Sequence, residues 1–191
     1  IEQYSEGSSA GFAKSFQELL LALVLAIVLS YFVLAIFFGS LGQPLVILFT
    51  VPLTFLGVFP ALASFTTGEF GFLEIIGLII LVGIVENVAI FLIDAANQKI
   101  RDDQWEEKRA ISFASGIRFR PVILTKITAI ASLAPLALLS EFYRSISLVI
   151  IFGLITSGFT SLITTPILFI FFRWLSRSFQ ALQWWHKILF F

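Results

Sequence analysis

Five apolar stretches, each long enough to cross a lipid bilayer as a helix, constrain the fold of this chain more than any other feature. They cover residues 19–38, 45–65, 72–96, 121–139 and 145–172. A helix of about 20 apolar residues spans the hydrocarbon core. Helices are expected because lipid offers no hydrogen-bond partner to an unpaired backbone group. The sequence therefore predicts an all-α membrane protein with five transmembrane helices.

The composition agrees with this class and excludes several others. Hydrophobic residues make up 59% and charged residues 13% of the 191 residues, whereas soluble domains are about half apolar and about a quarter charged. The chain has no cysteine and one histidine, His186, which excludes disulfides and metal sites built on Cys or His. It also lacks the motifs of nucleotide-binding loops, nucleophile elbows and zinc enzymes. We therefore expect no enzyme activity, no bound cofactor or metal, and no nucleic-acid partner.

The polar segments suggest how the chain is divided. Residues 1–18 are rich in polar and small residues, and we expect them to be the end of an exported domain or a linker. Residues 19–173 form the five-helix bundle. Within it, residues 97–120 mix apolar and charged positions, which predicts a short amphipathic helix along the membrane surface. Residues 174–191 alternate tryptophans with basic residues and are expected to be an interfacial tail.

The distribution of basic residues predicts the orientation of the bundle. With five spans, one side of the membrane holds only Lys14 and Arg144. The other side holds nine basic residues: Lys99, Arg101, Lys108, Arg109, Arg118, Arg120, Arg173, Arg177 and Lys187. Because basic loops stay in the cytoplasm, we expect the N-terminus on the periplasmic side and the C-terminus in the cytoplasm.

The first residue is Ile1 and the sequence contains no methionine, so we expect the chain to be part of a longer protein. An N-terminus outside the cytoplasm also requires an upstream domain or a cleaved signal to have carried residue 1 across the membrane. The composition of the first residues fits the end of such an exported part.

Three ionisable side chains fall inside the predicted spans: Glu86, Asp94 and Lys126. Each costs about 2.5–3.5 kcal/mol at a helix centre on insertion scales, so such residues are functional candidates. Glu86 is roughly 15 Å from either end of its span, close to the bilayer midplane. One interpretation is a proton relay in which Glu86 is the protonatable carboxyl and Lys126 its countercharge.

Structural interpretations of the same three residues remain open. Lys126 can extend its charge to the cytoplasmic headgroups or pair with Asp94 at a similar depth. Asp94 can be an interfacial residue at a helix end. Glu86 has no such route to the surface, and its structural alternative is a neutral, hydrogen-bonded carboxyl between helices.

Small and hydroxyl residues recur every four positions in the last span, at Gly153, Ser157, Ser161 and Thr165. Such a pattern lets two helix backbones approach closely, which predicts a helix–helix interface. A water-lined groove that serves Glu86 is the alternative.

Local patterns in a fixed order resemble the transmembrane half of resistance-nodulation-division (RND) efflux pumps of the hydrophobe/amphiphile type. The similarity covers about residues 10–173. The patterns are FGSLGQPL (38–45) with TVPL (50–53), GLIILVGIV (77–85) followed by Asn87, RFRPVILT (118–125), APLA (134–137) and TPIL (165–168).

This resemblance implies a proton-driven exporter of the bacterial inner membrane that needs no cofactor beyond the proton-motive force. The family is usually trimeric, with large periplasmic domains, a periplasmic adaptor and an outer-membrane channel. This chain would supply five helices of a six-helix repeat in the C-terminal half, and the N-terminal half and periplasmic domains would be the missing partners.

The resemblance also implies which residues carry protons. Asn87 stands where the family has the first polar residue of a pair, Val88 departs from the second, and Glu86 stands one place earlier, about 100° around the helix. Lys126 replaces a residue that is usually small or a hydroxyl. The candidates for a proton relay are Glu86, Asn87, Asp94, Thr125 and Lys126.

Two other functions fit the sequence less well. An accessory of protein export similar to SecDF has a comparable six-helix repeat, but the Arg-x-Arg-Pro and Thr-Pro-Ile-Leu patterns favour efflux. A membrane scaffold or sensor subunit in a larger complex would not transport at all.

Overall fold

The computed structural model describes the backbone of residues 2–65 and 71–189, and the side chains of residues 14–65 and 71–175. These residues form helices only: α1 (Glu2–Phe38), α2 (Gly42–Leu48), α3 (Thr50–Phe65), α4 (Phe72–Asp102), α5 (Glu107–Leu139) and α6 (Glu141–Leu189). Five segments are long and apolar enough to cross a membrane, with α2 and α3 together forming the second. The prediction of a five-helix, all-α membrane protein is confirmed.

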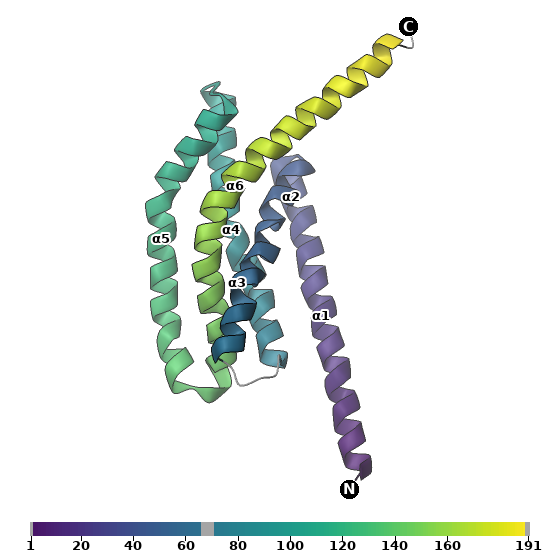
Figure 1. The fold of residues 1–191 in the computed structure, drawn as a ribbon, viewed down its shortest axis with the longest axis vertical. Helices are drawn as coiled ribbons and strands as arrows, with labels where there is room; N and C mark the ends of the chain where they lie inside the picture. Colours follow the sequence, from purple (N-terminus) through teal and green to yellow (C-terminus); the bar gives the residue numbers. More distant parts are fainter. Residues whose placement is uncertain (1, 66–70, 190–191) are drawn as a thin grey trace.

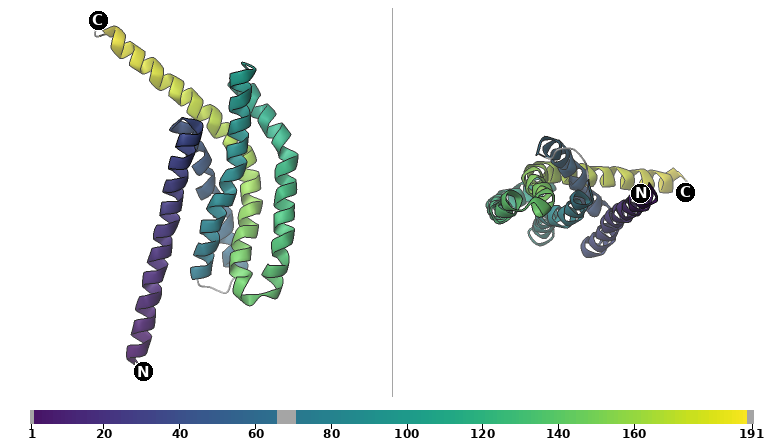
Figure 2. Two further views of the ribbon diagram at one scale, coloured as in Figure 1. Left: turned by 180° about the vertical axis from the view of Figure 1, so that it is seen from behind. Right: turned by 90° about the horizontal axis from the view of Figure 1, so that it is seen from below.

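Helix α6 is the centre of the bundle (Figure 1). It has its most extensive contacts with α4 and α5, followed by α3. Helix α1 packs along α4, but its N-terminal part leaves the bundle, as the two further views also show (Figure 2). The span in α1 is consequently only 6% buried, compared with 56% of the span in α4.

Apolar side chains fill the contacts between these helices. Val58 of α3, Leu81 and Val85 of α4, and Val149 of α6 form one cluster. A second cluster, nearer to the α4–α5 connection, includes Ile47, Ile93, Ile111 and Phe169 from four helices. In lipid, helices associate through such close packing and not through the hydrophobic effect.

The chain reverses direction after α1 at Gly39. This residue has a φ of +58°, a left-handed backbone conformation in which the absence of a Cβ removes the steric penalty. Helix α2 follows at Gly42, and Pro44 lies in its first turn, where a proline is tolerated because its missing N–H would have no partner within the helix.

The connection between α4 and α5 differs from the predicted surface helix over residues 97–120. Helix α4 continues to Asp102 and α5 already begins at Glu107. Three residues of this segment pack inward: Ala110, Ile111 and Ala114 are at most 1% exposed and belong to the cluster around Phe169. They therefore serve helix packing and not the membrane surface, which explains the difference.

Both ends of the chain are helical where the structure describes them. Residues 2–18 continue α1 without a break, and α6 continues to Leu189. The side chains of the predicted interfacial tail beyond Leu175, including Trp184, Trp185 and Lys187, lie outside the described residues.

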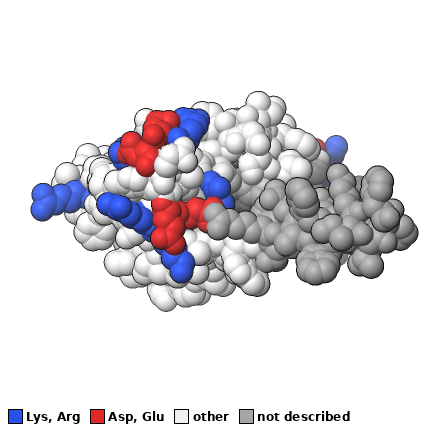
Figure 3. Space-filling view, turned by 90° about the horizontal axis from the view of Figure 1, so that it is seen from above, with Lys and Arg blue, Asp and Glu red and all other residues white. Residues whose placement is uncertain are grey.

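Charged side chains gather at the end of the bundle where α4 joins α5. Figure 3 looks onto this end, where Lys and Arg side chains lie beside Asp and Glu side chains. Two exposed ion pairs, Lys99–Asp103 and Arg101–Asp102, contribute to this surface. The indole of Trp105 in the same connection lies 4.3 Å from the guanidinium carbon of Arg109.

Candidate functional site

The carboxyl of Glu86 is enclosed between helices inside the bundle. Glu86 is 5% exposed on α4, and its neighbours Val82, Val85 and Ala89 on the same helix are also buried. The hydroxyl of Ser30 on α1 lies within reach of this carboxyl. Its Oε1 atom is buried and has no hydrogen-bond partner among the described residues. A carboxyl so placed can hold a proton away from water, but it is costly to keep ionised there.

Lys126 lies on α5 and is directed to α6. Its Nζ atom donates a hydrogen bond of 2.6 Å to Oγ of Ser157, and its carbon chain runs past Gly158, where a Cβ atom would lie 3.1 Å from Cδ of the lysine. The ammonium is therefore held between α5 and α6 by a hydroxyl and not by a carboxylate.

The structure does not form the ion pair between Glu86 and Lys126 that the sequence suggested. Glu86 faces α1 and Lys126 faces α6, and the ion pairs of the described side chains all lie elsewhere. Nor does Lys126 pair with Asp94, which is exposed on α4. The helical geometry explains why these pairs do not form, because successive side chains on a helix point in directions that differ by about 100°.

The other relay candidates lie on the outside of this chain. Asn87 and Asp94 are both exposed, and their seven-residue spacing places them on one face of α4, together with the exposed ring of Phe91. Thr125 is exposed on α5, and its hydroxyl donates to the carbonyl oxygen of Pro121 at 2.6 Å. The five candidates therefore do not converge on one point within the described chain.

The stripe of small residues on α6 faces the interior. Ser157, Ser161 and Thr165 are 0% exposed, and a Cβ atom on Gly153 would collide with the side chain of Leu81 on α4. The hydroxyl oxygens of Ser161 and Thr165 are buried, and no described side chain or backbone group forms a hydrogen bond with them. These positions allow α6 to lie close to its neighbours.

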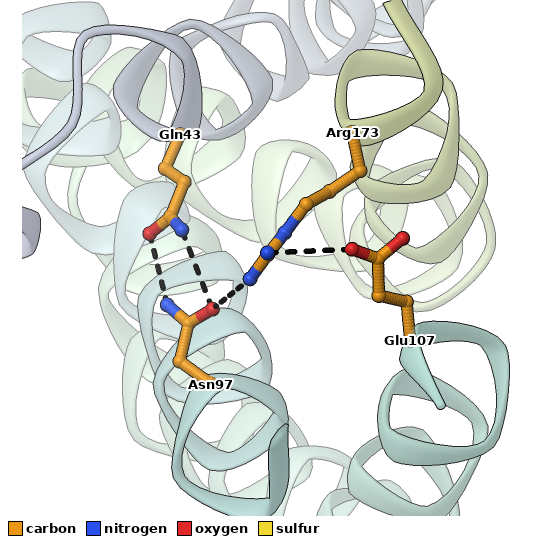
Figure 4. A network of polar contacts seen from close by, with 4 residues as sticks. All are labelled: Gln43, Asn97, Glu107 and Arg173. Carbon is orange, nitrogen blue, oxygen red and sulfur yellow. Dashed lines mark hydrogen bonds and ion pairs between the residues drawn. The ribbon is translucent and has the colours of Figure 1, made fainter. Parts of the chain in front are cut away.

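A polar network that the sequence did not predict joins four helices near the α4–α5 connection (Figure 4). Gln43 of α2 and Asn97 of α4 exchange two hydrogen bonds, of 2.9 and 3.3 Å. Arg173 of α6 donates to Oδ1 of Asn97 at 3.1 Å and forms an ion pair of 3.3 Å with Glu107 of α5. The network ties α4, α5 and α6 to the start of α2.

One signal in the sequence points to this network. Gln43, Asn97 and Arg173 each stand at the end of a predicted span, and Glu107 lies in the connection between the third and fourth spans. The five-span topology places all four on the same side of the membrane. Polar residues that meet at one end of a bundle can satisfy one another. Their pairing, however, depends on the lateral order of the helices, which the sequence pattern does not contain.

Comparisons with known proteins agree with this architecture. The sequence profile of the AcrB/AcrD/AcrF family matches residues 2–173. Multidrug resistance protein MdtC of Proteus mirabilis is 37% identical over 184 residues, which cover 90% of this chain and 18% of the relative. MdtC of Erwinia amylovora is 35% identical, covering 90% of this chain and 17% of the relative. MdtC of Yersinia pseudotuberculosis is 35% identical, covering 91% and 18% respectively.

The chain thus spans less than a fifth of the length of these curated relatives. Its five apolar helices and its match to the family make it a multi-pass protein of the inner membrane. The family profile covers the first four spans and all but the last two residues of the fifth. The chain therefore belongs to the AcrB/AcrD/AcrF family of RND efflux transporters.

Proposed function

We propose that this chain is the transmembrane part of the C-terminal half of a proton-coupled RND exporter, and that Glu86 is the group that carries the proton. The supporting observation is the carboxyl of Glu86, which is 5% exposed and has one buried oxygen with no partner in the part of the chain that the structure describes. A carboxyl without a bound countercharge can change its protonation state without first breaking an ion pair.

The neighbours of Glu86 suggest how protonation is coupled to movement. The hydroxyl of Ser30 on α1 lies within reach of the carboxyl, where it can form a hydrogen bond. The spans in α1 and α5 are the two least buried of the described spans, at 6% each. Gain or loss of a proton changes the strength of that hydrogen bond, since bonds to ionised groups are about twice as strong as neutral ones. Proton binding at Glu86 would thereby alter the docking of α1 on α4.

The exposed face of α4 supports a second element of the proposal. Asn87 and Asp94 lie on this face with no partner in the described chain. A polar face within a membrane bundle requires polar neighbours or water. We assign this face to contact with the N-terminal half of the transporter, and Asn87 and Asp94 to the part of the relay that both halves share.

Orientation and partners follow as proposals from the same assignment. The basic end at the α4–α5 connection lies in the cytoplasm, and the N-terminus of α1 leads to the periplasmic domains. The whole transporter is then a trimer that works with a periplasmic adaptor and an outer-membrane channel. The relatives are named multidrug resistance proteins, which supports small amphiphilic molecules as substrates.

The test is proton-coupled export by the full-length transporter. Glu86→Gln keeps the size and hydrogen-bonding capacity of the side chain but cannot release a proton. Export of a fluorescent amphiphilic dye from cells that lack their own pumps, and dye-driven proton flux in proteoliposomes, should both fall at least tenfold while expression stays normal. The control is Glu141→Gln, which removes an exposed carboxylate at the start of α6, at the end of the bundle away from the α4–α5 connection. It should leave both rates unchanged.

A second measurement addresses the proton directly. Infrared difference spectra of the full-length protein in lipid should show a carboxyl band that responds to pH and disappears in Glu86→Gln. Unchanged export by that variant would refute the role of Glu86, and a band that never responds to pH would make the carboxyl a structural element.

A further inference from the structure

An apolar groove runs along the outer surface between α5 and α6. It has a volume of about 320 Å³ and is lined by side chains of both helices, among them Phe119, Ile127 and Ile130 of α5 and Phe159 and Ile163 of α6. The single charged residue in its lining is Lys126. A surface that faces lipid chains needs apolar side chains only. The ammonium of Lys126 therefore requires a separate explanation, such as a polar or anionic group that enters the groove.

The groove has the length of one leaflet. Along α5, Phe119 and Ile130 are separated by eleven residues, or about 16 Å at 1.5 Å per residue. Half of a hydrocarbon core of about 30 Å is about 15 Å. From Pro121 to Leu139, Lys126 is the only charged residue of α5, so Arg120 marks the membrane surface and the groove reaches inward from there to about the midplane.

The mouth of the groove is positively charged. Arg120 is exposed and precedes Ile123 and Ile127, which line the groove, by three and seven positions, so it lies on the same face of α5. Deeper in the groove, the ammonium of Lys126 has three N–H donors. Of the described residues, Ser157 is the one that accepts a hydrogen bond from it.

We propose that this groove binds an anionic phospholipid of the leaflet on the side of the α4–α5 connection. One acyl chain lies along the apolar lining, the phosphate pairs with Arg120, and Lys126 donates to oxygens of the glycerol ester region. Charge complementarity favours this occupant over another apolar helix, because a helix would bury the ammonium without offering it an acceptor.

The assignment also agrees with the physics of lipid recognition. Basic residues close to the cytoplasmic surface attract anionic lipids, and basic pockets between transmembrane helices bind their headgroups. Two charges in the groove should favour an anionic over a zwitterionic lipid by about 25-fold, at about fivefold per basic residue. A zwitterionic lipid with the same chains would fill the groove without this gain.

The experiment is native mass spectrometry of the purified full-length transporter, titrated separately with phosphatidylglycerol and with phosphatidylethanolamine of the same acyl chains. The wild type should retain phosphatidylglycerol preferentially. The double variant Arg120→Gln, Lys126→Gln should reduce that preference about 25-fold. The matched control is Lys108→Gln, which removes an exposed charge at the start of α5 outside the groove and should leave the preference unchanged.

A third variant tests the apolar part of the groove. Gly158→Leu places a large side chain against Lys126, since even a Cβ there lies 3.1 Å from the lysine Cδ, and it should reduce retention of both lipids. If Gly158→Leu does not yield a monodisperse protein, the charge variants decide. Equal retention of both lipids by the wild type, or equal losses in Lys108→Gln and the double variant, would overturn the proposal.

Absence of any retained lipid would also overturn it and would indicate that another helix of the transporter covers the groove. Lipid retention is measured without transport, so this proposal and the proton-carrying role of Glu86 can fail independently.

Discussion

Gly153 of α6 packs directly against Leu81 of α4, and replacing it should separate the two helices. A Cβ atom at this position would collide with Cδ1 and Cδ2 of Leu81 and lie 2.9 Å from its Cγ. Leu81 is 0% exposed, so it has no open space into which to move. Overpacking of such a site costs about 1–3 kcal/mol. For a cooperative unit of about 150–250 residues, this corresponds to a melting temperature lower by about 2–12 °C.

The assay is thermal melting of the purified full-length transporter, followed as the loss of monodisperse protein on gel filtration. Gly153→Ala should melt earlier, whereas Gly116→Ala should not, because a Cβ on Gly116 meets no atom within 4 Å and alanine favours a helix over glycine by about 1 kcal/mol. Leu81→Ala removes the three colliding atoms. Combined with Gly153→Ala it should therefore cost less than the sum of the single changes, by at least about 0.5 kcal/mol.

Two results would refute this reasoning. If Gly153→Ala melts at the wild-type temperature, α4 and α6 are further apart than the structure shows. If the effects of Gly153→Ala and Leu81→Ala simply add, the destabilisation arises elsewhere and not from contact between these two side chains.

Two further predictions concern the end of the bundle at the α4–α5 connection. Arg173→Gln should lower the melting temperature more than Arg101→Gln. Arg173 joins Asn97 and Glu107 across three helices, whereas Arg101 forms an exposed ion pair with the adjacent Asp102. Equal shifts would show that the network adds no stability. Trp105→Ala should accelerate tryptic cleavage between residues 99 and 109 severalfold, because it removes the ring that Arg109 and Lys99 contact at 4.3 and 5.5 Å from its centroid. The control is Phe119→Ala, which changes an aromatic residue further along α5. Similar cleavage rates in both variants would contradict the prediction.

The spans themselves were predictable from the sequence, although their ends were not. The third span was expected over residues 72–96, and α4 covers Phe72–Asp102. Hydropathy locates the part of a helix that suits lipid, but it does not detect where the helix continues into water. Here the continuation is stabilised by a contact with another helix, since Asn97, its first residue, is bonded to Gln43 of α2.

The candidate site was only partly predictable. Burial of Glu86 was expected from its central place in an apolar span, and the structure encloses it. The expected countercharge was Lys126, whose ammonium instead bonds to Ser157. The network of Gln43, Asn97 and Arg173 was not foreseen, because each residue alone resembles an ordinary polar residue at a helix end.

The sequence by itself therefore determined which segments are helical, which of them suit a membrane, and which polar residues are buried at a cost. These are properties of contiguous residues, since hydropathy is summed along the chain. Only the tertiary structure decided the partners of Glu86, Lys126 and Asn97. A helix turns about 100° per residue, so the direction of each side chain depends on how closely the helices approach. That approach is determined by contacts between distant residues, such as Gly153 and Leu81.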